Sequence, residues 1–239
     1  MRIGLATEYA ILADNIDEIR DLGIQDVKFS YSLSEDAIPI AEFARRLERV
    51  RDWGLRPIID LRTERGVVKE MVHASIEAEG VKVFASVYRS YGERFAEVVK
   101  TCEGLCDDWE WWGEPHCPHV TGGAFTAWDY AQSLRIVYEA AHEAVPDCRV
   151  WSGGFGVSLG ALSQSSGMRF LQDLVFARCP KCGVQYEPHF DECIRCRVAL
   201  REGAGKHFDV ANLHPYAHAR YIGQVLGYHD RQLKEMRAL

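Results

Sequence analysis

Two groups of residues in this chain have the types and the spacing that chemistry requires. One is a pair of CxxC motifs separated by ten residues, whose cysteines are Cys179, Cys182, Cys193 and Cys196. The other is a tryptophan-rich segment, residues 107–116, in which Glu114 is followed directly by a proline. Paired CxxC motifs indicate a metal site, whereas an acid beside aromatic side chains indicates acid–base chemistry or ligand binding.

The spacing of the four cysteines predicts a zinc ribbon over residues 179–196. Each CxxC turn presents two thiolates to one ion, and four sulfur ligands are typical of tetrahedral structural zinc. Because four thiolates leave no open coordination position, we expect a structural metal with no catalytic part. Nucleic-acid binding through nearby arginines is a minor alternative, since the chain as a whole is acidic.

The segment around Glu114 has the alternation of a β-strand. Its two faces would carry Trp109, Trp111 and Gly113 on one side and Glu110, Trp112 and Glu114 on the other. Pro115 forces the chain out of a sheet, so Glu114 would lie at the C-terminal end of the strand, where barrel enzymes place catalytic residues. Flanking indoles would raise the pKa of the carboxyl group and stack on sugar rings. The alternative is a surface loop acid after a tryptophan-rich core strand.

Composition and charge exclude several classes of protein. With 47% hydrophobic and 26% charged residues the chain has the make-up of an ordinary globular protein. A net charge of −7 disfavours a general nucleic-acid binder. No run of about 18 apolar residues would span a membrane, and the N-terminus lacks the apolar core of a secretory signal. We therefore expect a cytoplasmic or otherwise non-secreted protein.

Short β-branched runs alternate with helical periodicity along the chain. Six strands are predicted, at residues 3–6, 27–31, 57–61, 109–112, 150–154 and 208–213. Helices are predicted between and after them: from the cap Asp14 to Gly23, around residues 43–50 up to Gly54, over most of 66–104, from the cap Thr126 to Val145, over 168–178, and from about 221 to the end. The first would bury Ile16, Ile19 and Leu22, the second Phe43, Leu47 and Val50, and the fourth Leu134, Val137, Ala141 and Val145.

This alternation predicts an α/β fold with a parallel sheet and right-handed crossovers. We interpret it as a (β/α)8 barrel that is incomplete, with about six βα units, in a single domain over residues 1–239 that carries the zinc ribbon as an insertion. Four polar residues would lie at or near C-terminal strand ends, which form one face of a barrel: Glu8, Asp60, Glu114 and His214. No phosphate-binding loop or dinucleotide fingerprint is present.

Two segments resemble motifs of one enzyme family. Residues 110–115, Glu-Trp-Trp-Gly-Glu-Pro, look like the E-x-W-N-E-P motif on strand four of clan A glycoside hydrolases, which are retaining enzymes on (β/α)8 barrels. Residues 209–216 are similar to the strand-six D-x-x-x-x-H-x-Y motif of families such as the β-xylosidases and α-L-iduronidases. Order and spacing agree along the whole chain, although only these two motifs are specific.

The resemblance implies a role for individual residues. Glu114 matches the general acid/base, and His214 and Tyr216 match residues that line the sugar subsite. Trp112 and Trp151 are candidates for the walls of that subsite or for the core. The partner expected on this basis is a carbohydrate.

Two departures from the family pattern matter. Gly113 stands where the family has an asparagine that hydrogen-bonds the sugar 2-hydroxyl, a contact worth several kcal/mol in the transition state. Retaining hydrolysis also needs a nucleophilic carboxylate about 5 Å from the acid, and in this clan it ends strand seven. Six units are counted before Leu239; Glu235 falls in the last predicted helix, and Glu8 is only a weak substitute. Three explanations are open: a second chain completes the barrel, the chain forms a homo-oligomer through its unpaired edges, or the sequence is a truncated product.

Two hypotheses of different classes follow. In the first, the chain is a glycoside-hydrolase-like protein that hydrolyses or binds a carbohydrate, with Glu114 as general acid/base and the nucleophile supplied from outside the chain. In the second, it is a catalytically inactive barrel that serves as a carbohydrate-binding or structural subunit of a larger assembly such as a virion. The missing nucleophile and the zinc ribbon favour the second, while Glu114 and the His-Pro-Tyr segment at 214–216 favour the first.

Overall fold

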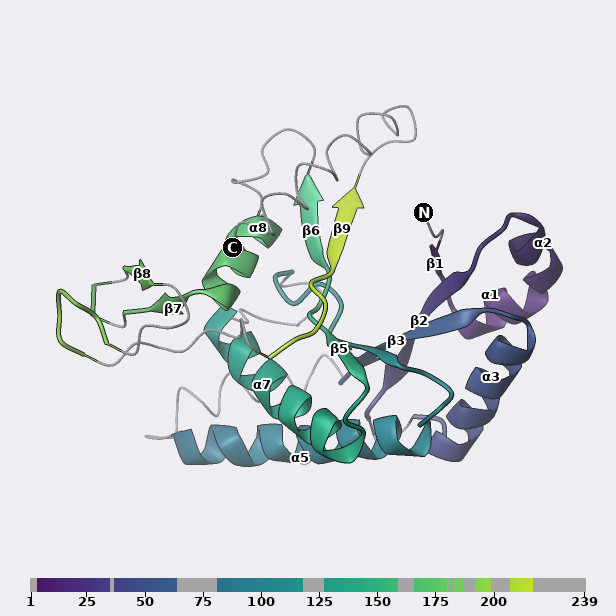
Figure 1. The fold of residues 1–239 in the computed structure, drawn as a ribbon, viewed down its shortest axis with the longest axis horizontal. Coiled ribbons are helices and arrows are strands. Elements are labelled where there is room, and N and C mark those ends of the chain that lie inside the picture. Colours follow the sequence, from purple (N-terminus) through teal and green to yellow (C-terminus); the bar gives the residue numbers. More distant parts are fainter. Residues whose placement is uncertain are drawn as a thin grey trace.

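A computed structural model of the chain shows a parallel sheet with helices along one face (Figure 1). It describes residues 4–34, 37–63, 81–117, 127–158, 166–179, 181–182, 184–186, 192–198 and 207–216. The helices predicted at 66–80 and from 221 onward, and the cap Thr126, lie outside these ranges. No helix in the described part is long and apolar enough to cross a membrane.

Five parallel strands form the main sheet in chain order. They are β1 (Gly4–Ala6), β2 (Asp26–Ser32), β3 (Arg56–Arg62), β4 (Asp108–Trp111) and β5 (Arg149–Trp151). A second parallel ladder continues beyond β5, where β6 (Phe155–Ser158) pairs with β9 (Leu213–Tyr216). An isolated parallel bridge between Trp151 and Val210 connects the two ladders. The parallel order of the predicted strands is therefore confirmed, but two positions are wrong: the fifth strand is broken at residues 152–154, and the sixth, predicted at 208–213, begins only at Leu213, so that His214 lies within β9.

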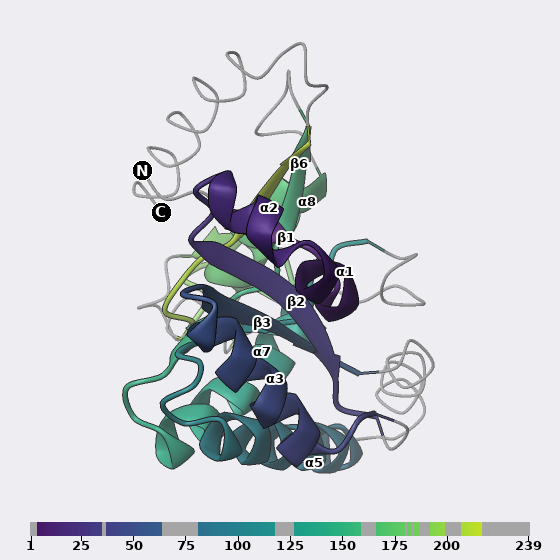
Figure 2. The same ribbon diagram turned by 90° about the vertical axis from the view of Figure 1, so that its right-hand side faces the viewer.

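Helices follow the strands and cover the sheet. They are α1 (Tyr9–Asp14), α2 (Ile16–Asp21), α3 (Ile40–Asp52), α5 (Val81–Thr101), α7 (Ala127–Ala144) and α8 (Ser166–Val175). Figures 1 and 2 show α5 and α7 lying side by side under the strands, with α3 next to α5. The predicted stripe Phe43, Leu47 and Val50 is buried, and α3 ends before Gly54, whose φ of +78° is the left-handed conformation that glycine adopts without strain.

The first predicted helix is wrong in two respects. Instead of capping a helix, Asp14 is the last residue of α1, and Asn15 separates α1 from α2. The Asn15 side chain donates to the carbonyl of Ile11 at 2.7 Å, which terminates α1 early. Of the residues predicted to be buried by this helix, Ile19 is buried, whereas Leu22, the C-cap residue of α2, is 71% exposed. The helix predicted to reach Arg178 also ends sooner, at Val175, because β7 (Ala177–Arg178) pairs antiparallel with β8 (Gln185–Tyr186).

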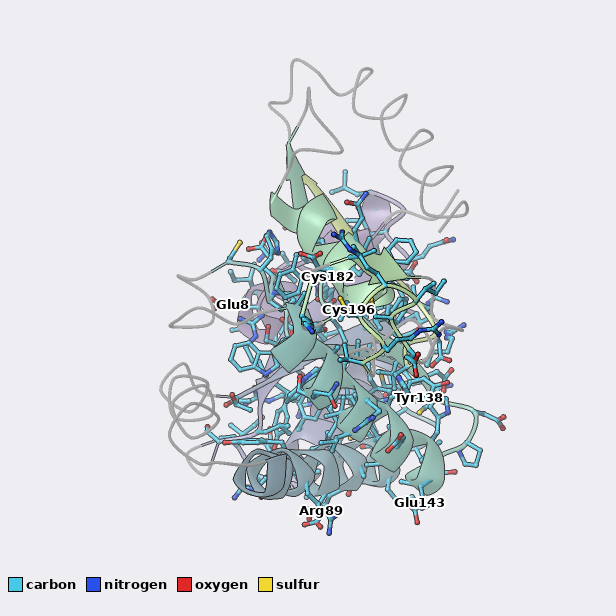
Figure 3. All side chains as sticks on the ribbon, turned by 90° about the vertical axis from the view of Figure 1, so that its left-hand side faces the viewer. Glu8, Arg89, Tyr138, Glu143, Cys182 and Cys196 are labelled. Carbon is cyan, nitrogen blue, oxygen red and sulfur yellow. The ribbon has the colours of Figure 1, made fainter. Side chains whose placement is uncertain are left out.

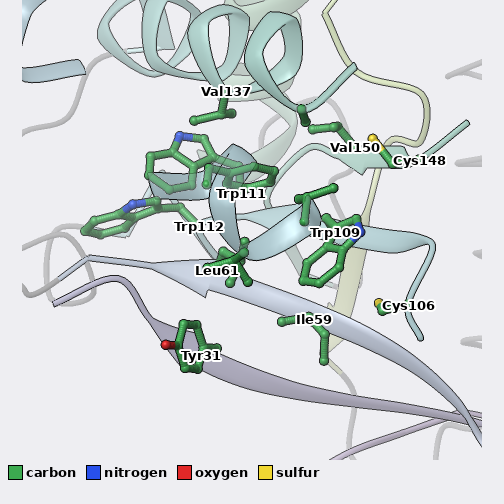
Figure 4. Packing of buried hydrophobic residues seen from close by; sticks show 14 of the residues in the cluster. Tyr31, Ile59, Leu61, Cys106, Trp109, Trp111, Trp112, Val137, Cys148 and Val150 are labelled. Carbon is green, nitrogen blue, oxygen red and sulfur yellow. The ribbon is translucent and has the colours of Figure 1, made fainter. Parts of the chain in front are cut away.

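The hydrophobic core lies between the sheet and the helices. Alternate strand residues face the helices and are buried, including Val27, Phe29, Ile59, Leu61, Trp109, Trp111 and Val150. Figure 4 shows Trp111 beside Val137 of α7, and Trp109 beside Ile59, its register partner on β3. The Trp111 indole N–H donates to Ser133 Oγ at 3.0 Å, so this buried side chain has no unsatisfied polar group. The tryptophan-rich strand is thus a core strand on one face, and its other face must carry the polar residues.

Candidate functional site

The inner face of the sheet, opposite the helices, is polar and balanced in charge. Alternate residues on β2 to β5 form four ion pairs: Asp26 with Arg56, Lys28 with Glu110, Asp60 with Arg62, and Asp108 with Arg149. Three of these carboxylates are at most 1% exposed. Buried carboxylates persist only with cations or hydrogen-bond donors, and the pairing across strands supplies both.

Glu110 of β4 lies at the centre of this face, and three separate segments contact its carboxylate. Lys28 of β2 forms an ion pair with Oε2, the side-chain amide of Asn212 donates to the same oxygen at 2.8 Å, and the Gly154 N–H donates to Oε1 at 3.0 Å. Burial raises the pKa of Glu110 to about 7; Lys28 opposes this shift and Asp60 reinforces it. Glu110 is therefore a buried carboxyl group that titrates near neutral pH.

Glu114 follows β4 in a turn that is strained at two residues. Trp112 and Glu114 have φ angles of +58° and +56°, in the left-handed region that costs a non-glycine residue about 1–2 kcal/mol. Three hydrogen bonds of 3.1 Å tie the turn to its neighbours: Trp112 N–H to Leu61 O, Gly113 N–H to Asp60 Oδ1, and Glu114 N–H to Gly154 O. Such strain persists only where the surroundings enforce it, and it clusters at functional sites.

The glycine at 113 has a structural explanation. A Cβ atom built there would lie 3.0 Å from Oδ2 of Asp60, closer than nearly all real Cβ contacts. Asp60 also accepts the Gly113 N–H and is ion-paired with Arg62. The buried Asp60 carboxylate therefore occupies the space in which an asparagine side chain at this position would begin.

The break between β5 and β6 makes room for the Glu114 turn. A Cβ atom on Gly153 would overlap the carbonyl oxygen of Trp112 and lie 2.6 Å from Cδ of Pro115. The Gly153 N–H instead donates to the Tyr130 hydroxyl at 2.6 Å, and that hydroxyl donates to the Trp111 carbonyl at 2.6 Å. Glycine at 153 thus allows the two strand ends to approach closely.

The half-buried Glu114 lies beside a cysteine and a histidine. The Cys117 N–H donates to the Glu114 carbonyl at 3.0 Å, and the Cys117 thiol lies 3.3 Å from Nε2 of His116. Burial, and secondly the charge of Glu114, raise the pKa of this thiol. The Cys117 thiol is therefore protonated and a poor nucleophile, and the turn carries two further ionisable side chains, Glu114 and His116.

The two tryptophans expected near a sugar have different surroundings. Trp112 is 4% exposed and packs edge-to-face on Trp111, with ring centroids 6.2 Å apart (Figure 4). Trp151 is half-buried on β5 in register with Glu110, and its indole N–H donates to Asp108 Oδ1 at 2.8 Å. Asp108 begins β4, so this bond directs the Trp151 N–H away from the C-terminal strand ends.

The remaining residues expected at the site lie on the same edge of the sheet. His214 and Tyr216 are on β9, in register with Gly156 and Ser158 of β6, and only their backbone is described. Glu8 is the exposed N-cap residue of α1, two residues after β1 (Figure 3). Parallel strands in chain order bring the residues that follow their C-terminal ends to one edge, so the structure places the backbone of these residues and of Glu114 on one side of the fold.

Two cavities bordered by described residues lie away from Glu114. One of about 540 Å³ opens at the N-terminal ends of β2 to β4, beside Asp26, Arg56 and Asp107. Another of about 220 Å³ lies beyond β2, between Tyr31 and Arg94. Neither borders Glu114. The evidence for a site at Glu114 is therefore the strained and tethered turn.

The four predicted metal ligands converge in a lobe that Figure 1 shows projecting from α8, here called the four-cysteine lobe (the described residues within 177–198). Their sulfur atoms all lie within 4.8 Å of one another, and Cys182 and Cys193 are 3.8 Å apart. Tetrahedral bonds of about 2.3 Å to one ion require sulfur separations of about 3.8 Å. The N–H groups of Cys182 and Cys196 donate to Cys179 Sγ and Cys193 Sγ at 3.4 and 3.3 Å, so both CxxC turns have the same conformation.

The electrostatics of this cluster also fit a cation. A hydrogen bond with Cys182 is the main cause that raises the pKa of the Cys196 thiol to about 12. Four sulfurs this close cannot all be thiolates unless a positive charge lies among them, and a bound metal ion supplies it. Figure 3 shows Cys182 and Cys196 adjacent in the lobe. The four cysteines can therefore hold a metal ion.

Sequence reasoning missed the residues around Glu110. Nothing in the local sequence singled out Lys28, Glu110 or Asn212, which are up to 184 positions apart (212 − 28). A signal was nevertheless present, because polar residues recur at every second position in strands that are otherwise apolar: Lys28 and Ser30, Asp60 and Arg62, Asp108 and Glu110. That pattern would have identified a polar inner face.

Comparisons with known proteins show similarity in fold alone. No model of a protein family matches the sequence, and no curated protein matches it. A solved β-1,4-D-mannanase from Cryptopygus antarcticus is 12% identical over 92% of this chain and 68% of its own, with a TM-score of 0.53. A β-glucosidase from Thermotoga maritima (14% identity, 69% and 42% coverage, TM-score 0.42) and a β-xylosidase from Caulobacter crescentus (13%, 63% and 35%, 0.38) are less similar.

The likeness to the mannanase indicates a class of fold. The parallel sheet and the mannanase likeness fit an incomplete barrel of the glycoside-hydrolase type. This chain spans only about two fifths of the length of the β-glucosidase from Thermotoga maritima in the structures that it matches, at 42% and 40%. The fold class predicted from the two motifs is thus supported, whereas the activity is a separate question.

Proposed function

We propose that this chain is a glycoside-hydrolase-like protein that binds a carbohydrate at the C-terminal strand ends, with Glu114 as its general acid/base. The observation that carries the proposal is the turn after β4, where two left-handed residues are held by hydrogen bonds from β3 and from the β5–β6 break. A surface loop acid would need neither the strain nor the tethers. The glycoside-hydrolase-like fold gives this turn its carbohydrate context.

In the proposed reaction Glu114 would protonate the glycosidic oxygen while a second carboxylate attacks the anomeric carbon and the bond to the leaving group breaks. Glu114 would then deprotonate the water that releases the sugar from the nucleophile. We assign that nucleophile to a carboxylate outside residues 1–239, with Glu8 as the weaker alternative within them. We assign His214 and Tyr216 to sugar contacts, with Trp151 as a further candidate; Trp112, which is 4% exposed and packs on Trp111, belongs to the core.

We also propose that the four-cysteine lobe holds a structural zinc ion. Its four sulfur ligands would fill the tetrahedral positions and leave none for substrate or water. The lobe projects away from the sheet (Figure 1), and Cys179 and Cys193 are almost fully buried within it. Zinc would supply a fixed local fold to a segment that has only the two-residue strands β7 and β8 among its described elements.

The test compares wild type with Glu114→Gln on a panel of aryl glycosides and on oligosaccharides in solution. We expect turnover to fall by a factor of about 100 to 10,000, the usual contribution of general acid–base catalysis, while carbohydrate affinity is retained. Glu103→Gln is the matched control, since this exposed acid follows α5, at the opposite ends of the strands.

The outcomes separate the hypotheses. Turnover that survives Glu114→Gln would refute Glu114 as acid/base. Oligosaccharide binding without any turnover would instead favour the carbohydrate-binding or structural subunit. Glu8→Gln in the same assay identifies an internal nucleophile, because its loss would abolish turnover as fully as the loss of Glu114.

A further inference from the structure

Both backbone polar groups of Gly154 are hydrogen-bonded, the N–H to a residue of β4 and the carbonyl to a residue of the turn that follows β4. Its N–H donates to Oε1 of Glu110 at 3.0 Å, and its carbonyl accepts the N–H of Glu114 at 3.1 Å. The two residues that hold it lie four positions apart, at the buried centre of the inner face and in the strained turn. The location of Gly154 therefore links the Glu110 carboxylate to the backbone of Glu114.

The same carboxylate also reaches the segment that leads into β9. The Asn212 side chain donates to Oε2 of Glu110 at 2.8 Å. The Asn212 backbone is fixed as well, because its N–H donates to Ser152 Oγ at 3.3 Å and its carbonyl accepts the Phe155 N–H at 3.1 Å. Glu110 thus joins three segments: β4, the β5–β6 break, and the approach to the strand that carries His214.

Stability alone does not explain a charge at this position. Glu110 is fully buried, and its pKa is raised because removal from water disfavours the ionised form more than Lys28 favours it. The other groups that face it are Asp60 of β3, a second acid, and Tyr130 of α7. Buried ion pairs are often no more stable than apolar side chains of the same volume, so a geometric role accounts better for this one.

We propose that Glu110 is a positioning residue, which fixes the Glu114 turn and the approach to β9 relative to each other through Gly154 and Asn212. Lys28 of β2 fixes the position of the Glu110 carboxylate through their ion pair. Gly154 is hydrogen-bonded both to that carboxylate and to the backbone N–H of Glu114, so it connects the two. Glu110 itself does not contact substrate. This inference rests on the function proposed for Glu114, but the tether it describes can be measured without a carbohydrate.

The test is amide hydrogen exchange, measured by NMR at Gly154 and Glu114 in Glu110→Ala and Glu110→Gln. We expect Glu110→Ala to speed exchange at both amides about tenfold, the effect of losing one buried hydrogen bond, with β2 and β3 unchanged. Glu110→Gln should restore protection only in part, because one carbonyl oxygen replaces two carboxylate oxygens that accept from Gly154 and from Asn212. Asp108→Ala is the matched control: Asp108 is equally buried and ion-paired on β4 but makes no contact with Gly154 among the described hydrogen bonds.

Each outcome bears on the proposal. Unchanged exchange at Gly154 and Glu114 in Glu110→Ala, or an equal change in Asp108→Ala, would overturn it. Where Glu110→Ala does not fold, Asn212→Ala removes one donor and keeps the carboxylate; several-fold faster exchange at Gly154 supports the tether and unchanged exchange refutes it.

In a wild type that turns over aryl glycosides, Glu110→Ala should lower kcat more than it raises KM, with partial rescue by Gln. A wild type without turnover or binding would refute the function of Glu114 and leave the exchange result to decide on Glu110.

Discussion

The four-cysteine lobe and the polar inner face of the sheet around Glu110 are both built from side chains that converge on one point, yet they form in opposite ways. All four cysteines come from 18 consecutive residues (179–196), and their sulfur atoms lie within 4.8 Å of one another. The groups around Glu110 come from residues 28 to 212 and meet only because five parallel strands lie side by side in register. One site depends on two short turns, the other on the whole sheet.

This difference predicts how each region responds to damage. A local site that is ordered by a metal should unfold completely when the metal is removed, while the rest of the chain stays folded. A site distributed over five strands should respond gradually, because each contact is one of several that the core also supports. The predictions below test this contrast, beginning with the largest expected effect.

Metal removal should unfold the lobe and leave the barrel core intact. Chelation, or the pair Cys182→Ser and Cys196→Ser, removes an ion whose apparent binding free energy in small zinc domains is about 10–16 kcal/mol. Elemental analysis should find about one zinc ion per chain, and amides of residues 181–198 should lose protection while those of β2 and β3 keep it. Cys148→Ala, a buried cysteine outside the cluster, should keep the metal. Two results would contradict this difference between the regions: a lobe that stays folded without metal, or a sheet that unfolds together with the lobe.

The pH dependence of stability should carry the signature of Glu110. Its pKa is about 7 in the folded chain against 4.5 as the reference, so the folded state binds the extra proton between these values. Stability from this group is fully present below pH 4.5 and is lost as pH rises through 7. The difference in unfolding free energy between wild type and Glu110→Gln, from urea titrations at several pH values, should show this slope. A difference that is flat between pH 4.5 and 7 would contradict the burial of an ionisable Glu110.

A methyl group at residue 153 should disturb the inner face of the sheet without changing any charged residue. Gly153→Ala places its Cβ against the carbonyl of Trp112 and the ring of Pro115, so one strand end must shift. We expect a loss of about 2 kcal/mol in unfolding free energy, within the usual range for overpacking, and faster amide exchange at Glu114. Gly4→Ala is the control, since the nearest atoms to its Cβ would be at an ordinary 3.4 Å. Equal effects of the two substitutions would show that the turn adapts freely.

The smallest effect should come from the lobe, at a residue that binds no metal. Arg197 follows the second CxxC motif with a φ of +54°, and its N–H donates to the Cys193 carbonyl at 2.8 Å. Arg197→Gly should raise the free energy of unfolding of the metal-bound lobe by about 1 kcal/mol, because glycine adopts this conformation without steric cost. The exposed pair with Glu192 is lost too, which Glu192→Gln measures separately. Destabilisation beyond that control would mean that the turn is not strained.

Much of the fold was predictable because its signals are local. Alternation in β2 to β4, the stripe of Phe43, Leu47 and Val50, and the glycine that ends α3 each depend on neighbours within a few residues. The first helix was predicted wrongly for the same reason, since a single side-chain bond from Asn15 to Ile11 outweighed its periodicity. The broken fifth strand was missed because its cause, the turn after β4, lies some 40 residues earlier in the chain.

The sequence by itself determined the parallel α/β order, the cysteine cluster and the location of Glu114 after a core strand. Each of these depends on a periodicity or a spacing, and both are properties of short segments. Only the tertiary structure decided that Glu110 is buried among Lys28, Gly154 and Asn212, and that the Glu114 turn is strained and tethered. Strand register sets which distant side chains meet, and burial then determines their charge, so neither appears in any single segment.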